Sequence, residues 1–100
     1  MIETRGRILV VDDEPLVLET IEAALKEEGY DVHSSSTSHH AIGQLDKNKF
    51  DAIVCDIKLD ELSGFEVLNF AKKKQQNITS ILITGAPNAG DRDRAKLLNA

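Results

Sequence analysis

The chain has 100 residues, of which 12 are Lys or Arg and 17 are Asp or Glu, so its formal net charge is −5. This length predicts one small domain over residues 1–100, and a hydrophobic fraction of 41% argues against intrinsic disorder. The acidic balance disfavours a nucleic-acid-binding surface, the single cysteine excludes an internal disulfide, and no apolar run has membrane-spanning length. We therefore expect a cytoplasmic protein without nucleic-acid or membrane partners.

The first predicted element is a strand at residues 8–11, an apolar and β-branched run of the kind that is buried on both faces of a sheet. Acidic residues end this strand abruptly, and Pro15 then suits the first turn of a helix. Gly29 is typical of the position just after a helix. Between them, helical spacing predicts inward-facing side chains at Val17, Ile21, Ala24 and Leu25.

A weaker strand is predicted at residues 30–35, and the following Ser and Thr residues are suitable helix N-caps. They begin a short helix that ends near Lys47. A second buried strand follows at residues 52–55, and Asp56 ends it.

The second half of the chain continues this alternation. Ser63 and Glu66 have the spacing of a capping box, which begins a helix that continues to about Lys74. A third strong strand is predicted at residues 81–83 and a last helix at residues 91–98. Strict alternation of strands and helices predicts an α/β fold with a doubly wound parallel sheet and helices on both faces.

Acidic and hydroxyl side chains follow the buried strands where those strands end. Asp12 and Asp13 follow the first strand, Asp56 follows the next buried strand, and Thr84 follows the last. In an open parallel sheet, ligands bind outside the carboxyl ends of the strands. Any one acid there is an ordinary loop residue, but three converging carboxylates would need a hard cation such as Mg²⁺ to offset their repulsion. A carboxylate beside Mg²⁺ can also attack phosphorus.

Three runs of the sequence resemble the receiver domain of response regulators in two-component signalling systems. They are Ile8 to Pro15, the stretch from Asp56 to the helix after Ser63-Gly64, and Ile81 to Ala86, and the similarity covers the chain from Arg7 to Ala100. The resemblance implies a flavodoxin-like sheet of order 2-1-3-4. It also implies a signalling switch rather than an enzyme.

The resemblance also implies a role for each site residue. Asp56 would be the phosphoacceptor, which takes a phosphoryl group from a sensor histidine kinase or a phosphotransfer protein. Asp13 and Asp56 would bind Mg²⁺ directly, with Mn²⁺ as a substitute, while Asp12 would act through water and Lys58 through its backbone carbonyl. Thr84 would supply the hydroxyl that binds the phosphoryl group.

Two departures from the family pattern are visible. Asp60 stands where the family has proline, and the fifth strand and fifth helix, with the family's lysine, have no counterpart up to Ala100; Lys96 comes too early to replace it. The expectation is therefore a C-terminally truncated receiver domain without an output domain, which is phosphorylated slowly or undetectably. The alternatives are a phosphorylation-independent interaction module and a Mg²⁺-dependent phosphohydrolase that would use Asp60 or Glu61.

The missing strand would leave residues 80–84 as an apolar edge strand without a charge or proline, which predicts self-association through that edge or low stability. The lysines at 72–74 are interpreted as a solvated helix end, with a small docking patch as the alternative. Cys55 is assigned to the core, and the histidines at 33, 39 and 40 to the surface.

Overall fold

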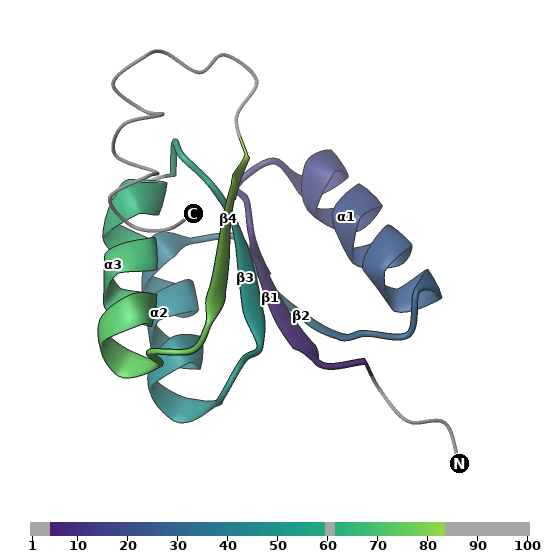
Figure 1. Cartoon of the computed structure of the whole chain (residues 1–100). Coiled ribbons are helices and arrows are strands. Elements are labelled where there is room, and N and C mark those ends of the chain that lie inside the picture. The colour runs from purple at the N-terminus through teal and green to yellow at the C-terminus, as the bar shows by residue number, and fades with distance from the viewer. Residues whose placement is uncertain (1–4, 60–61, 84–100) are drawn as a thin grey trace.

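The computed structural model describes residues 5–59 and 62–83, and strands and helices alternate throughout these ranges (Figure 1). The expected helix at 91–98, Thr84, Asp60, Glu61 and Lys96 lie outside the described residues. The described elements are, in chain order, β1 (Arg7–Val11), α1 (Pro15–Glu27), β2 (Asp31–Ser35), α2 (Ser38–Lys47), β3 (Ala52–Asp56), α3 (Gly64–Lys74) and β4 (Thr79–Ile83).

The four strands form one parallel sheet of order β2-β1-β3-β4, as expected. Figure 1 shows α1 on one face of this sheet and α2 with α3 on the other. The doubly wound arrangement is thus confirmed. It places the carboxyl ends of β1 and β3 side by side, because Val11 pairs with Cys55 in the register of these two strands.

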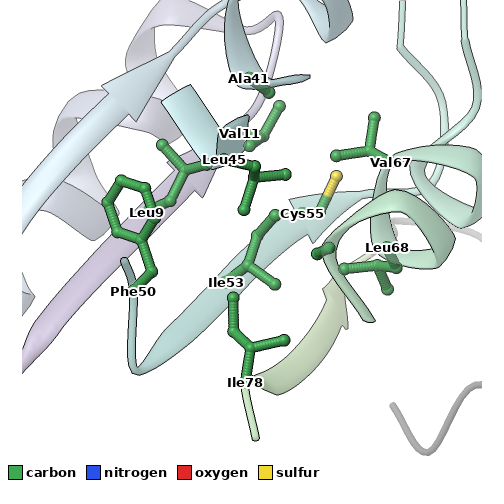
Figure 2. Close-up of a cluster of buried hydrophobic side chains, with 11 residues drawn as sticks. Leu9, Val11, Ala41, Leu45, Phe50, Ile53, Cys55, Val67, Leu68 and Ile78 are labelled. Carbon is green, nitrogen blue, oxygen red and sulfur yellow. The ribbon is translucent and has the colours of Figure 1, made fainter. Parts of the chain in front are cut away.

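Each sheet face carries its own hydrophobic cluster, because successive residues of a strand point to opposite faces. Figure 2 shows the cluster on the side of α2 and α3. The strands contribute four side chains to it that have no exposed surface: Leu9, Val11, Ile53 and Cys55. On the side of α1, the buried members are Ile8, Val10 and Val54. Burial on both faces is the reason why these strands are continuous apolar runs.

Local signals in the sequence fix where the helices begin and end. Thr37 caps α2, and its Oγ1 accepts a hydrogen bond from the backbone N–H of His40 at 3.1 Å. Ser63 and Glu66 form the expected capping box at the start of α3. Gly29, just after α1, has a φ of 96°, a left-handed conformation that favours glycine. The predicted boundaries are therefore confirmed to within a few residues.

The predicted inward face of α1 is wrong at two positions. Val17 is 38% exposed and Ala24 is also exposed, whereas Leu18, Ile21 and Leu25 pack against the sheet. A stripe through 17, 21 and 24 and a stripe through 18, 21 and 25 are both compatible with helical spacing. The contact with the sheet selects the second, and α1 contains no fully buried residue. None of the described helices has the length and apolarity of a membrane-spanning segment.

One buried hydroxyl gives a stability prediction. Ser80 is 4% exposed, and its Oγ has no hydrogen-bond partner within the described part of the chain. An unsatisfied buried hydroxyl costs free energy, so Ser80→Ala should raise the free energy of unfolding by about 1 kcal/mol. Urea denaturation measures this, with Thr79→Ala at the exposed neighbouring position of β4 as the control. A lower stability of Ser80→Ala would show that the hydroxyl has a partner.

Candidate metal and phosphoacceptor site

The strand ends bring three carboxylates together. Asp12 and Asp13 directly follow β1, and Asp56 is the last residue of the neighbouring β3. One carboxylate oxygen from each of the three residues lies within 4.8 Å of the other two. The convergence expected from the sequence is therefore present in the fold. We call these three residues the acidic cluster.

The members of the acidic cluster differ in exposure. Asp12 is only 3% exposed; its Oδ1 accepts a hydrogen bond from the backbone N–H of Glu14 at 2.8 Å, which fixes the turn into α1. Asp13 is exposed, and Asp56 is half-buried. The backbone N–H of Lys58 donates to Asp56 Oδ1 at 3.4 Å. The cluster thus has one anchored carboxylate and two that remain accessible to a ligand.

The electrostatic environment makes ionisation of Asp56 costly. Partial burial raises the pKa of this carboxyl, and the negative charges of Asp12 and Asp13 raise it further, while the backbone N–H groups of Lys58 and Ile57 lower it. No described Lys or Arg side chain forms a salt bridge with the acidic cluster. Three carboxylates without a counter-charge are suited to a hard divalent cation with oxygen ligands, and the donor set fits Mg²⁺.

The raised pKa gives a pH-dependent stability prediction. Because folding raises the pKa of Asp56, the folded state binds the proton more tightly, and stability falls as the pH rises from the unfolded pKa through the folded one. In metal-free buffer, Asp56→Asn should therefore be more stable than the wild type at pH 7. The gain should vanish near pH 3. Glu27→Gln, at an exposed position of α1, is the control, and an equal gain there would contradict the prediction.

The start of α3 lies directly against the end of β3. The backbone N–H of Gly64 donates to the carbonyl of Ile57 at 2.7 Å. A Cβ at residue 64 would overlap the carbonyl oxygen of Asp56 and would lie 2.8 Å from its carbonyl carbon. Only glycine fits there, so Gly64 sets how closely the helix approaches the Asp56 backbone. The capping pattern at Ser63 was visible in the sequence, whereas this contact was not predicted, although a glycine at the first helical position was the available signal.

Ser38 is a second residue that the sequence analysis missed. It is fully buried at the start of α2, and its Oγ accepts a hydrogen bond from the backbone N–H of Leu62 at 3.3 Å. This bond ties the segment before α3 to the neighbouring helix. Ser38 stands in a run of serines and threonines, and nothing in that run distinguishes it as the residue that bonds to Leu62.

The remaining candidates lie outside the acidic cluster. Cys55 is fully buried, as expected, and Figure 2 shows its side chain among the apolar residues packed under α3. Burial raises the pKa of its thiol to about 12, so it stays protonated at neutral pH. The side chain of Lys58 is exposed, and the role of its carbonyl stays a prediction, as does the role of Thr84.

Two of the histidines make side-chain contacts that the sequence did not predict. His33 is half-buried rather than exposed, with its ring edge-on to Phe50 at a centroid distance of 5.6 Å. His40 is exposed, yet its Nδ1 lies 2.7 Å from the buried Oγ of Ser35. The β2 end thereby connects to the acidic cluster, because the carbonyl of Ser35 accepts a hydrogen bond from the backbone N–H of Asp12.

Comparison with known proteins relates this geometry to a family. The family model described as response regulator receiver domain matches residues 8–100. The transcriptional regulatory protein TcrA of Mycobacterium tuberculosis is 38% identical over 84 residues, which cover 83% of this chain and 32% of TcrA. The heme response regulator HssR of Staphylococcus aureus is 33% identical over 87 residues, or 87% of this chain and 38% of HssR. The chain thus spans about a third of the length of these relatives.

Solved structures agree with the observed fold. A CheY-like receiver domain protein from Methanospirillum hungatei superimposes with a TM-score of 0.89 at 29% identity, over 94% of this chain and 75% of that one. The non-phosphorylated HemR receiver domain from Leptospira biflexa gives a TM-score of 0.88 at 29% identity, over 96% of this chain and 77% of that one. The parallel sheet with its strand order is therefore shared with these proteins.

Proposed function

The chain belongs to the response regulator receiver domain family, and we propose that within it Asp56 is the phosphoacceptor of a Mg²⁺-dependent phosphorelay. Receiver domains are signalling modules of two-component systems, which interact with histidine kinases or phosphotransfer proteins. The convergence of Asp12, Asp13 and Asp56 within 4.8 Å is the observation that carries the proposal. One receiver domain over residues 1–100, a cytoplasmic location and the absence of nucleic-acid and membrane partners remain predictions.

The proposed reaction is a direct transfer between two residues. An oxygen of the Asp56 carboxylate attacks the phosphorus of a phosphohistidine; the new O–P bond gives an acyl phosphate, and the broken N–P bond leaves the imidazole to take up a proton. Asp13 and Asp56 would bind Mg²⁺ directly, Asp12 through water, and Lys58 through its carbonyl. Bound metal supplies positive charge to the transferring oxygens. The Thr84 hydroxyl would bind the phosphoryl group once it is on Asp56.

The geometry supports the contributions proposed for Asp12 and Asp56. The hydrogen bond from Glu14 holds the Asp12 carboxylate in place, and the Lys58 N–H holds that of Asp56. Phosphoryl transfer depends mainly on positioning and charge neutralisation, so a preformed arrangement of acids is what this chemistry requires. The raised pKa of Asp56 reflects repulsion from the neighbouring negative charges, and a bound cation would relieve that repulsion.

Labelling tests the proposal. A small phosphoryl donor such as acetyl phosphate, with Mg²⁺, should modify Asp56 alone, and the label should be stable in acid and labile in base. Intact-mass and peptide-mass measurements locate it, with Asp56→Asn as the unlabelled control. A label that persists in Asp56→Asn would refute the assignment. An unmodified protein that still binds a signalling partner would favour the interaction module, and steady hydrolysis of a phosphomonoester would favour the phosphohydrolase.

We also propose that the chain self-associates through the edge of β4. Among the described strands β4 is paired only with β3, and Ile81 on it is 45% exposed. Unprotected apolar edges recruit further strands, and a lysine at the edge opposes this. Light scattering should therefore show association that Ile81→Lys reduces, while Leu16→Lys, at a 74% exposed apolar position of α1, leaves it unchanged. Equal effects of both variants would contradict an edge contact.

A further inference from the structure

The first turn of α2 lies at the same edge of the sheet as the acidic cluster. Helix α2 begins at Ser38, shortly after the carboxyl end of β2, and the acidic cluster follows the carboxyl ends of the parallel strands β1 and β3. Figure 1 shows α2 beside α3 on one face of the sheet. The start of α2 can therefore contact the segment that connects Asp56 to α3.

Ser38 is a polar residue in a fully buried position. It has no exposed surface, and Ala41, one turn further along α2, is equally buried. Alanine would fill such a position without the free-energy cost of burying a hydroxyl. Buried hydroxyls normally have a hydrogen-bond partner, and the Oγ of Ser38 accepts a hydrogen bond from the backbone N–H of Leu62 at 3.3 Å. This bond is a role that alanine could not fill.

The segment between β3 and α3 is held by one bond within itself and by one bond to α2. The carbonyl of Ile57 accepts a hydrogen bond from the backbone N–H of Gly64 at 2.7 Å, and the backbone N–H of Leu62 donates to Ser38. The Leu62 side chain also packs against the hydrophobic cluster of Figure 2. Lys58 follows Ile57 directly, and its own N–H makes a hydrogen bond of 3.4 Å, which is long for this type. The position of Lys58 therefore depends on the bonds that flank it.

We propose that Ser38 is a positioning residue for the metal site. By holding Leu62 at the start of α2, it fixes the segment that contains Lys58, whose carbonyl is the proposed metal ligand. The inference rests on the proposed function, since it concerns the ligand set of the same Mg²⁺ ion. Ser38 acts only through the backbone of Leu62. Residues that orient metal ligands without contacting the metal contribute to metal affinity in this way.

Hydrogen exchange measured by NMR on the metal-free protein tests the bond itself. The Leu62 amide of the wild type should be protected, because it donates to a buried acceptor; this part of the test needs no variant. In Ser38→Ala its exchange should become about two- to tenfold faster, as expected from the net contribution of one hydrogen bond. The Gly64 amide should change less, because its acceptor is retained. An unprotected Leu62 amide in the wild type, or equal exchange in both proteins, would overturn the inference.

Titration calorimetry tests the consequence for the metal. Ser38→Ala should bind Mg²⁺ about two- to tenfold more weakly, because ordering the segment then costs the free energy that the hydrogen bond had supplied. Labelling of Asp56 by acetyl phosphate should be slower at low Mg²⁺ and should reach the wild-type rate at saturating Mg²⁺. A substitution that only lowered the stability of the fold would not give this dependence on Mg²⁺, since the folded molecules would keep their affinity.

The matched control is Ser80→Ala, which removes the hydroxyl of another buried serine, in β4. Its Mg²⁺ affinity should equal that of the wild type, and thermal melts verify that both variants are folded. A wild type that binds no Mg²⁺ would refute the proposed function and this inference with it. If the wild type binds Mg²⁺ and Ser38→Ala binds it equally well, or if Ser80→Ala loses as much affinity, the inference alone is refuted.

Discussion

Replacing Gly64 by alanine will lower the free energy of unfolding by about 3 kcal/mol, at the upper end of the cost of overpacking a core. The added methyl group would overlap the carbonyl oxygen of Asp56 and lie 2.8–2.9 Å from the Asp56 carbonyl carbon and the Cα of Ile57. All these atoms are backbone, which cannot move aside by a change of rotamer. The helix must retreat or the end of β3 must shift, so the hydrogen bond from Gly64 N–H to Ile57 should also be lost.

Gly43→Ala is the matched control for this prediction, because it is the same substitution in another helix. Its Cβ would meet no atom of the described residues within 4 Å, and alanine is the better helix former, so the free energy of unfolding should rise by about 0.5–1 kcal/mol. Urea denaturation of the two variants should therefore show shifts of opposite sign. A loss of stability in both, of similar size, would mean that general backbone effects and not the contact with Asp56 decide the outcome.

Replacing Asp13 by alanine will weaken Mg²⁺ binding at least about a hundredfold. This loss is larger than the loss from removing a residue that only orients a metal ligand, because Asp13 is proposed to be a ligand itself. Asp13 is the exposed member of the acidic cluster, and with it goes one of the two carboxylates proposed to contact the ion directly. Titration calorimetry measures the affinity. Labelling of Asp56 by acetyl phosphate should fall in parallel, because both depend on the same bound cation.

Glu14→Gln is the control for the metal prediction. It removes one negative charge from the adjacent residue, which is exposed and does not belong to the acidic cluster. The backbone N–H that bonds to Asp12 is retained in this variant, so the turn should stay intact. Its Mg²⁺ affinity should change less than about threefold, as for an exposed charge. Equal weakening in both variants would show that net charge attracts the ion and that no defined ligand set exists.

Much of the acidic cluster could be predicted before any coordinates, because its residues follow recognisable strands. A short, β-branched apolar run such as Ile8 to Val11 is typical of a buried strand, and in a parallel sheet the residues after such strands lie at one edge. That rule places Asp12, Asp13 and Asp56 at one edge of the sheet. Their convergence also requires the two strands to be neighbours, which the resemblance to receiver domains implied. The sequence could not predict which carboxylate is held in place. The hydrogen bond from the Glu14 N–H to Asp12 depends on the geometry of the turn.

The sequence by itself determined the order of the elements and their approximate ends, because these depend on periodicity and caps, which are local. The strand order followed only from the resemblance to receiver domains. The tertiary structure decided which stripe of α1 faces the sheet, why residue 64 must be glycine, and that Ser80 is buried without a hydrogen-bond partner among the described residues. These outcomes depend on contacts between residues far apart in the chain. Helical spacing permits several faces, and only the shape of the opposing surface selects one of them.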